Sequence, residues 1–195
     1  MVSPLKAILL NSGGIDSRVA AAIAHKSQWN LVSLYIDCNP YSRSRSLPAA
    51  ERTAELYCSE HVVMPFPMDL ILLGDKRPNP SLPGGTAYSS LFCAILASSY
   101  AKWRGDVNCI VSGTKNDAWV PEWKDRLAEL MAGYKLHKPP MFFAPVAELL
   151  QVKDVYLKAQ ELGVPLEDTS SCGAAEPCGI CKKCVQRGEM GLPIL

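Results

Sequence analysis

The stretch "LLNSGGIDSRVAAAIAH", residues 9–25, joins an apolar run to an alanine-rich segment with the pattern of a helix. Its two adjacent glycines permit backbone conformations and close approaches that a side chain would block. A turn of this kind before a helix presents backbone N–H groups to an anion, and Ser12 and Ser17 can add hydroxyl donors. The stretch therefore predicts a phosphate-binding loop. The alternative is a tight turn in which Asp16 or Ser17 caps the helix.

Apolar runs and helix-like segments alternate along the rest of the chain. We expect strands over 5–10, 31–37, 61–66, 107–113 and 141–146, and helices over 17–26, 47–60, 86–103, 121–136 and 152–163. The strands are apolar on both faces, which is typical of a parallel sheet covered by helices on both sides. Pro48 is expected in the first turn of its helix. The loops 11–17, 38–46 and 114–121 should meet at the carboxyl edge of the sheet, where such folds bind ligands.

Length and composition indicate an ordinary globular protein. The chain has 195 residues, 48% of them hydrophobic and 20% charged, with a net charge of +1. A near-neutral charge gives no overall electrostatic preference for nucleic acid or membranes. No apolar run reaches the length of a membrane span, and the run at 5–10 is too short for the core of a signal peptide. We therefore expect a cytoplasmic protein without a membrane partner.

Half of the eight cysteines lie in the C-terminal stretch "SSCGAAEPCGICKKC", residues 170–184. Two cysteines separated by two residues can bind one metal ion, and four thiolates complete a closed, tetrahedral zinc site. The expected ligands are Cys172, Cys178, Cys181 and Cys184.

The cysteine spacing has two interpretations other than a zinc site. An iron–sulfur cluster is one, because C-x2-C-x2-C begins the ferredoxin run, but that run continues to a further cysteine and 185–195 contains none. Disulfides are the other, and a cytoplasmic setting disfavours them. The remaining cysteines are expected to be free thiols, most of them in apolar surroundings: Cys38, Cys58, Cys93 and Cys109.

The string SGGIDS after an apolar strand resembles the phosphate loop of the PP-loop ATP pyrophosphatases. Together with the four-cysteine tail, which runs into "VQRGEMGL", it resembles the 7-cyano-7-deazaguanine synthase family within that superfamily, as a divergent member. The resemblance covers nearly the whole chain. It implies a Rossmann-like α/β fold of the adenine nucleotide α-hydrolase type over 1–167, with a parallel five-stranded sheet flanked by helices. A C-terminal zinc module over 168–195 would pack on it.

The resemblance also implies roles for individual residues. The residues expected to bind ATP are Ser12, Gly13, Gly14, Asp16, Ser17 and Asp37. Asp16 would organise the phosphates and Mg²⁺, and Asp117 would lie near the substrate. Lys115 directly follows a strand and is a further candidate for contacting substrate or phosphate. The expected catalytic residues are Ser12, Asp16, Lys115 and Asp117.

In this family ATP adenylates the carboxylate of 7-carboxy-7-deazaguanine, and ammonia displaces AMP to give an amide. A second adenylation, of the amide oxygen, permits dehydration to the nitrile. The implied cofactors are ATP, Mg²⁺ and Zn²⁺, and the implied partners are the small-molecule substrate, ammonia and a second copy of the chain in a homodimer.

Three loops depart from the family pattern. "CNPYSRSRS" (38–46) replaces an aromatic-Gly-Gln-basic stretch, "LPGGTAYSS" (82–90) lacks the arginine of Pro-Gly-Arg-Asn, and "KNDAWVPEWKDR" (115–126) carries two tryptophans. These loops would recognise the acceptor, so three alternatives stay open. One is a ligase that joins a deazaguanine carboxylate to an amine of a macromolecule. The others are a PP-loop enzyme that modifies or thiolates tRNA, for which thiolation needs a reactive cysteine pair, and a non-enzymatic zinc-knuckle protein that binds nucleic acid.

Overall fold

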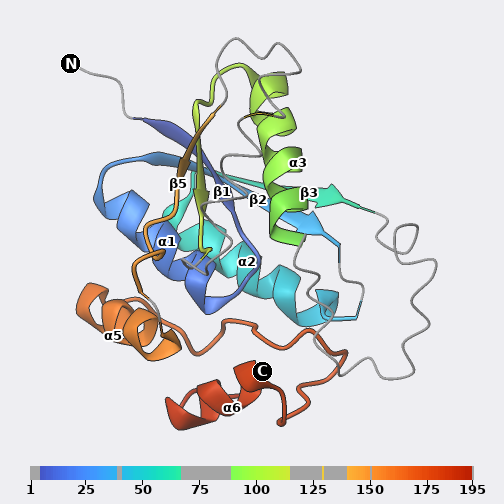
Figure 1. Cartoon of the computed structure of the whole chain (residues 1–195), viewed down its shortest axis with the longest axis vertical. Helices are drawn as coiled ribbons and strands as arrows, with labels where there is room; N and C mark the ends of the chain where they lie inside the picture. Colours follow the sequence, from blue (N-terminus) through green and yellow to red (C-terminus); the bar gives the residue numbers. More distant parts are fainter. Residues whose placement is uncertain are drawn as a thin grey trace.

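The computed structural model describes residues 5–38, 41–66, 89–114, 129, 140–149 and 151–194. Its elements are drawn in Figure 1. Lys115, Asp117 and, apart from Glu129, the helix expected over 121–136 lie outside the described residues.

A five-stranded parallel sheet forms the centre of the molecule, in the order β3-β2-β1-β4-β5. The strands are β1 (Lys6–Leu10), β2 (Asn30–Asp37), β3 (Glu60–Pro65), β4 (Cys109–Ser112) and β5 (Met141–Phe143). Leu10 at the end of β1 is in register with Leu34 and Ser112 on its two neighbours. The predicted parallel sheet of five strands is confirmed, and β1 is its central strand.

Helices cover both faces of the sheet (Figure 1). They are α1 (Ile15–Lys26), α2 (Arg43–Tyr57), α3 (Ser89–Arg104) and α5 (Val152–Leu162), while α6 (Lys182–Glu189) lies farther from the sheet. On one face α1 and α5 bury Val19 and Val155 against Leu9 of β1, and α2 lies beside α1. On the other face α3 buries Ala97 and Ala101 against β1, β2 and β4. Apolar burial on both sides of each central strand is the main stabilising contribution to this arrangement.

The start of α2 differs from the expectation. The helix begins at Arg43 rather than at 47, so Pro48 lies inside it and not in its first turn. The extra turn is held by hydrogen bonds: Ser46 Oγ donates to the Ser42 carbonyl over 2.9 Å, and the Tyr35 hydroxyl lies 2.8 Å from Ser46 Oγ. A contact with β2 therefore extends the helix beyond the point indicated by the local sequence.

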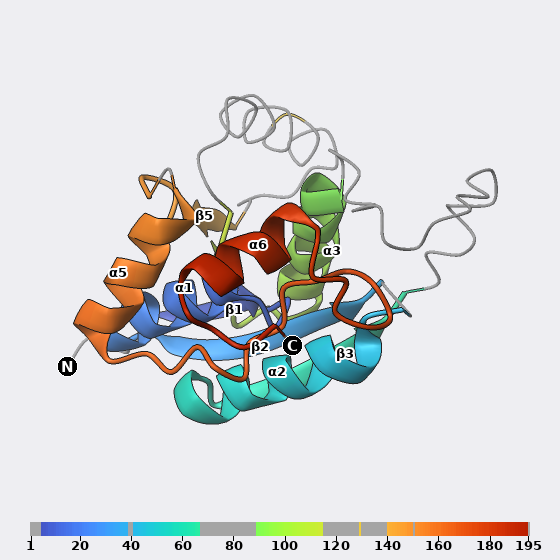
Figure 2. The same cartoon turned by 90° about the horizontal axis from the view of Figure 1, so that it is seen from below.

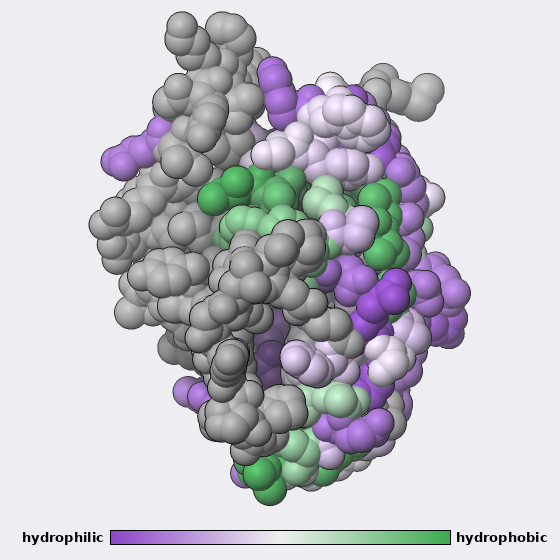
Figure 3. Space-filling model, turned by 90° about the vertical axis from the view of Figure 1, so that its right-hand side faces the viewer, coloured by the Kyte–Doolittle hydropathy of each residue, from purple (hydrophilic) through white to green (hydrophobic). Residues whose placement is uncertain are grey.

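β3 forms one edge of the sheet, and its Val63 side chain is 37% exposed. Figure 3 shows the molecule from the right-hand side of Figure 1, with hydrophobic residues gathered between hydrophilic ones.

Within the described ranges, no helix combines the length and hydrophobicity required to cross a membrane.

Candidate active site and metal centre

Asn11 anchors the loop between β1 and α1. Its buried side-chain amide donates to Ser33 Oγ over 2.9 Å and to the Ala50 carbonyl over 2.8 Å. Its side-chain oxygen accepts a hydrogen bond from the Gly13 amide over 3.1 Å. The loop is thus fixed to β2 and α2 before any ligand binds. Asn11 was not among the predicted site residues. Its position between the strand and the SGG string could have marked it as part of the loop, although not its contacts with β2 and α2.

Gly13 fits a position that no other residue can occupy without strain. Its φ is +73°, and a Cβ atom there would lie 2.3 Å from the Ser46 carbonyl oxygen. Gly14 is the N-cap of α1, and no side chain caps the helix. The alternative in which Asp16 or Ser17 is the N-cap is therefore wrong. The uncapped N-terminus of α1 can accept an anion, as phosphate-binding loops require.

The hydroxyls of Ser12 and Ser17 lie together on this loop, 3.4 Å apart. Ser12 is exposed, whereas Ser17 is buried and donates to the Gly14 carbonyl over 2.9 Å. Asp16 lies in the first turn of α1, where the helix dipole favours a carboxylate. The end of β4 approaches the same turn, because a Cβ atom on Gly113 would lie 2.6 Å from the backbone nitrogen of Ser17. The phosphate loop therefore lies between the ends of β1 and β4.

Asp37 ends the neighbouring strand β2 and pairs with Arg43, with 2.7 Å between Oδ2 and Nε. Arg45 turns instead toward the cysteine stretch. Its guanidinium donates to the backbone carbonyls of Cys172, over 3.4 Å, and Ala174. The basic residues of the 38–46 loop thus have partners within the chain.

The four C-terminal cysteines converge on one point, as predicted. All four Sγ atoms lie within 4.8 Å of one another. Three separations are 3.8 Å (Cys172–Cys178), 3.9 Å (Cys178–Cys184) and 3.4 Å (Cys181–Cys184). A zinc ion bound by four thiolates at about 2.3 Å holds them about 3.8 Å apart, whereas a disulfide needs about 2.05 Å. The geometry therefore fits a single tetrahedral ion such as Zn²⁺ and excludes disulfides. A four-iron cluster does not fit these sulfur separations. In such a cluster each thiolate binds a separate iron atom, which holds the cysteine sulfurs farther apart than one shared ion does.

The backbone of this centre is arranged for thiolates. The Cys181 amide donates to Cys178 Sγ over 3.3 Å. This N–H and that of Ile180 lower the pKa of the Cys178 thiol to about 6. Burial raises the pKa of the Cys184 thiol to about 12. A metal ion would overcome this cost, because the bound form of cysteine is the thiolate.

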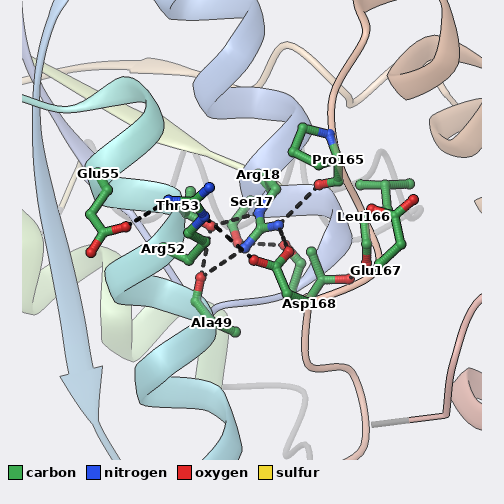
Figure 4. A network of polar contacts seen from close by, with 12 residues as sticks. Ser17, Arg18, Ala49, Arg52, Thr53, Glu55, Pro165, Leu166, Glu167 and Asp168 are labelled. Carbon is green, nitrogen blue, oxygen red and sulfur yellow. Dashed lines mark hydrogen bonds and ion pairs between the residues drawn. The ribbon is translucent and has the colours of Figure 1, made fainter.

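Arg18, directly after the phosphate loop, is completely buried. Its guanidinium donates to Thr53 Oγ1 over 2.9 Å and to the Ala49 carbonyl over 3.0 Å, both on α2. It also donates to the Pro165 carbonyl over 2.9 Å and forms an ion pair with Asp168 (Figure 4). Arg18 thus joins α1, α2 and the chain that leads to the cysteines. Sequence reasoning missed it, because an arginine in a helix ordinarily indicates an exposed face.

Comparison with known proteins places the chain among enzymes of one kind. It is 31% identical over 210 residues to a 7-cyano-7-deazaguanine synthase of Microcystis aeruginosa, covering 94% of this chain and 90% of the relative. A synthase of the same name from Synechococcus is 31% identical, covering 94% and 91%. One from Methanothrix thermoacetophila is 26% identical, covering 96% of each. No family model matches the chain.

Solved structures show the same fold. A predicted subunit of tRNA methyltransferase from Methanocaldococcus jannaschii superposes with a TM-score of 0.52 at 22% identity, covering 80% of this chain and 76% of that one. A 4-thiouridine synthetase in complex with RNA and ATP gives 0.51 at 19% identity, covering 95% and 49%. At such identities the likeness concerns the fold alone, and it agrees with the predicted PP-loop architecture.

Proposed function

The chain belongs to the 7-cyano-7-deazaguanine synthase family as a divergent member with an ATP-dependent function, and on that premise we propose that it converts 7-carboxy-7-deazaguanine to the nitrile. The observation that carries the proposal is the loop between β1 and α1. There Gly13 and Gly14 leave the backbone open at the uncapped N-terminus of α1. Backbone N–H groups and the helix dipole at such a site favour the pyrophosphate end of ATP.

In the first stage a carboxylate oxygen of the substrate attacks the α-phosphorus of ATP. The bond between this phosphorus and the oxygen bridging to the β-phosphate breaks, and pyrophosphate leaves. The amides of the phosphate loop would stabilise the departing charge, with hydroxyl hydrogen bonds from Ser12 and Ser17. The Asp16 carboxylate is positioned to hold Mg²⁺, which would neutralise phosphate charge when bound.

In the second stage ammonia attacks the adenylated carbonyl carbon and AMP leaves, which gives the amide. The amide oxygen then attacks the α-phosphorus of a second ATP, and a second pyrophosphate leaves. Departure of AMP with loss of the two nitrogen protons gives the nitrile. Each carboxylate oxygen thus leaves in a molecule of AMP. Asp37 at the end of β2 would contact the nucleotide, while Lys115 and Asp117 remain candidates for contacting the substrate.

We assign the four-cysteine centre a structural role. Four thiolates complete the coordination of zinc and leave no position open for a reacting group. Its donor set and its sulfur separations of 3.4 to 3.9 Å support this assignment. The zinc would therefore hold the C-terminal segment in place and take no part in the chemistry.

The test is a reaction with 7-carboxy-7-deazaguanine labelled with ¹⁸O at both carboxylate oxygens, Mg-ATP and ammonium, followed by mass spectrometry. Nitrile formation with one ¹⁸O in each AMP is the expected result. Unlabelled AMP would contradict adenylation of the acceptor, and no product would contradict the substrate. Asp16→Asn should abolish pyrophosphate release, whereas Ser99→Ala should not, because Ser99 is an exposed residue of α3 bonded only within its helix.

One observation favours a second candidate, ATP-dependent thiolation of RNA. Cys38 directly follows β2 and Cys93 belongs to α3, and both pack against the same apolar cluster, so they form a candidate cysteine pair outside the metal centre. This reaction would need a persulfide donor, and the product would contain sulfur in place of an oxygen. Incubation with Mg-ATP, a persulfide donor and unmodified transfer RNA distinguishes the two, because Cys38→Ser would abolish thiolation but leave nitrile formation intact.

A further inference from the structure

Residues 165–170, here called the tether, lead into the cysteine stretch. They also contact the phosphate loop in space. The Ser170 amide donates to the Gly13 carbonyl over 2.9 Å. A Cβ atom on Gly14 would lie 3.4 Å from the Ser170 carbonyl oxygen. The backbone of the tether therefore packs directly against the two loop glycines. A displacement of the tether would displace the phosphate loop, and the reverse.

Arg187 holds the tether from the side of the metal centre. Its guanidinium donates to Thr169 Oγ1 over 2.7 Å and to the Glu167 carbonyl over 3.3 Å. The Thr169 hydroxyl in turn donates to the Leu166 carbonyl over 2.6 Å, so it both accepts and donates. Arg187 lies one turn after Cys184 on α6, and both side chains are buried. Figures 1 and 2 show the chain before α6 passing along α1 and α2, with α6 outside it.

The charge of Arg187 ties this contact to the metal centre. Its side chain is 1% exposed, and burial lowers the pKa of its guanidinium. A buried cation is costly unless an opposite charge lies near it. Zinc with four thiolates carries a net charge of −2, and its ligand Cys184 lies one turn before Arg187 on α6, with both side chains buried. An occupied centre thus favours the arginine in the position where it bonds to Thr169.

We propose that Arg187 and Thr169 are positioning residues that couple zinc at the four-cysteine centre to ATP at the phosphate loop. The contacts run from Cys184 along α6 to Arg187, then to Thr169, Ser170 and Gly13. The inference rests on the proposed function in one respect, namely that the phosphate loop binds ATP. Thermodynamic coupling is reciprocal, so bound ATP must then strengthen zinc retention as much as zinc strengthens ATP binding.

The first experiment uses the zinc-loaded, unmodified chain. The partition of zinc between the chain and a chromogenic chelator is measured at equilibrium with and without Mg-ATP, in the absence of any acceptor, and ATP binding is measured by calorimetry on the same sample. We expect saturating Mg-ATP to lower the equilibrium dissociation constant of zinc, measured by competition with the chelator, about tenfold, within the usual range of coupling between sites. An unchanged dissociation constant with ATP bound would overturn the coupling alone. Failure to bind ATP would overturn the proposed function as well.

The second experiment breaks the chain of contacts at one hydroxyl. Thr169→Val keeps the shape of the side chain but removes the hydroxyl that accepts from Arg187 Nη1, while the contacts of Arg187 with the Pro193 and Glu167 carbonyls remain. Thr169→Ser restores the hydroxyl. We expect Thr169→Val to retain one zinc per chain, to lose the protection by ATP, and to raise KM for ATP about tenfold with kcat little changed. Thr169→Ser should recover all three properties.

Ser98→Ala is the matched control, because Ser98 is also a buried hydroxyl residue and its hydroxyl donates to the Ala94 carbonyl of its own helix. Its ATP protection and KM should equal those of the unmodified chain. Protection by ATP that persists in zinc-loaded Thr169→Val would overturn the role of this hydroxyl. Loss of zinc from Thr169→Val would contradict the expected retention of one zinc per chain and would overturn a role of this hydroxyl in coupling alone.

Discussion

Arg18 of α1 and Arg187 of α6 donate hydrogen bonds to the same short tether, to the Pro165 carbonyl over 2.9 Å and to the Glu167 carbonyl over 3.3 Å. Both side chains are buried almost completely. The segment that leads to the cysteines is therefore bound to α1 and to α6 through buried charged groups. The predicted domain boundary at 167/168 falls inside this bonded segment.

Replacement of Arg18 by alanine should destabilise the fold strongly. It removes hydrogen bonds to Ala49, Thr53 and Pro165 and leaves buried acceptors without a donor. We expect the free energy of unfolding in urea to fall by about 3 to 5 kcal/mol. Arg52→Ala is the control, because Arg52 also faces Asp168 but is half exposed, and it should cost less than about 1 kcal/mol. Equal losses for the two variants would contradict the role given to Arg18.

Gly13→Ala should abolish ATP binding. Gly13 and Gly105 share nearly the same φ, +73° and +74°, but a Cβ atom on Gly105 has open space while one on Gly13 meets the Ser46 carbonyl. Both variants should lose about 1 to 2 kcal/mol for the left-handed conformation. Gly13→Ala alone should also displace the loop. Calorimetric titration with Mg-ATP measures the difference, and normal binding by Gly13→Ala would refute the assignment of the loop.

Removal of one thiolate should release the metal. Cys184 and Cys109 are both 0% exposed, but only Cys184 belongs to the four-cysteine centre. Zinc-loaded chain should contain one zinc by atomic absorption, Cys184→Ser close to none, and Cys109→Ser the full amount. A chelator should lower the melting temperature of the unmodified chain and of Cys109→Ser alike. Full zinc content in Cys184→Ser would exclude the proposed ligand set.

Cys38 should react with iodoacetamide at neutral pH. The hydrogen bond with Cys93 lowers the pKa of the Cys38 thiol to about 7, while burial raises that of Cys58 to about 12. The thiolate is the reactive form, so the labelling rate of Cys38 should rise with pH, reach half its maximum near pH 7 and level off at higher pH. Cys93→Ala should move this midpoint toward the ordinary value of 9.0. Peptide mass spectrometry gives both rates, and faster labelling of Cys58 would contradict the assignment.

The candidate site was predictable where its chemistry depends on local pattern. Gly13 and Gly14 after an apolar strand indicated the phosphate loop, and the cysteine spacing indicated one metal ion, because neighbours in sequence must be neighbours in space. The ATP-binding and catalytic roles of all the predicted residues remain predictions, those of Asp37, Lys115 and Asp117 among them. Asn11 was missed, since its value lies in contacts with β2 and α2 that no local pattern reveals.

By itself the sequence determined the parallel sheet and the grouping of the four cysteines, because alternating apolar runs and cysteine spacing act over short stretches of chain. The tertiary structure alone decided that α2 begins at Arg43, that Gly14 is the cap of α1, and that the Ser170 amide meets the Gly13 carbonyl. Hydrophobic periodicity predicts which face of an element is buried, but it does not specify the partner. Hydrogen bonds between distant segments form only after packing has brought those segments together.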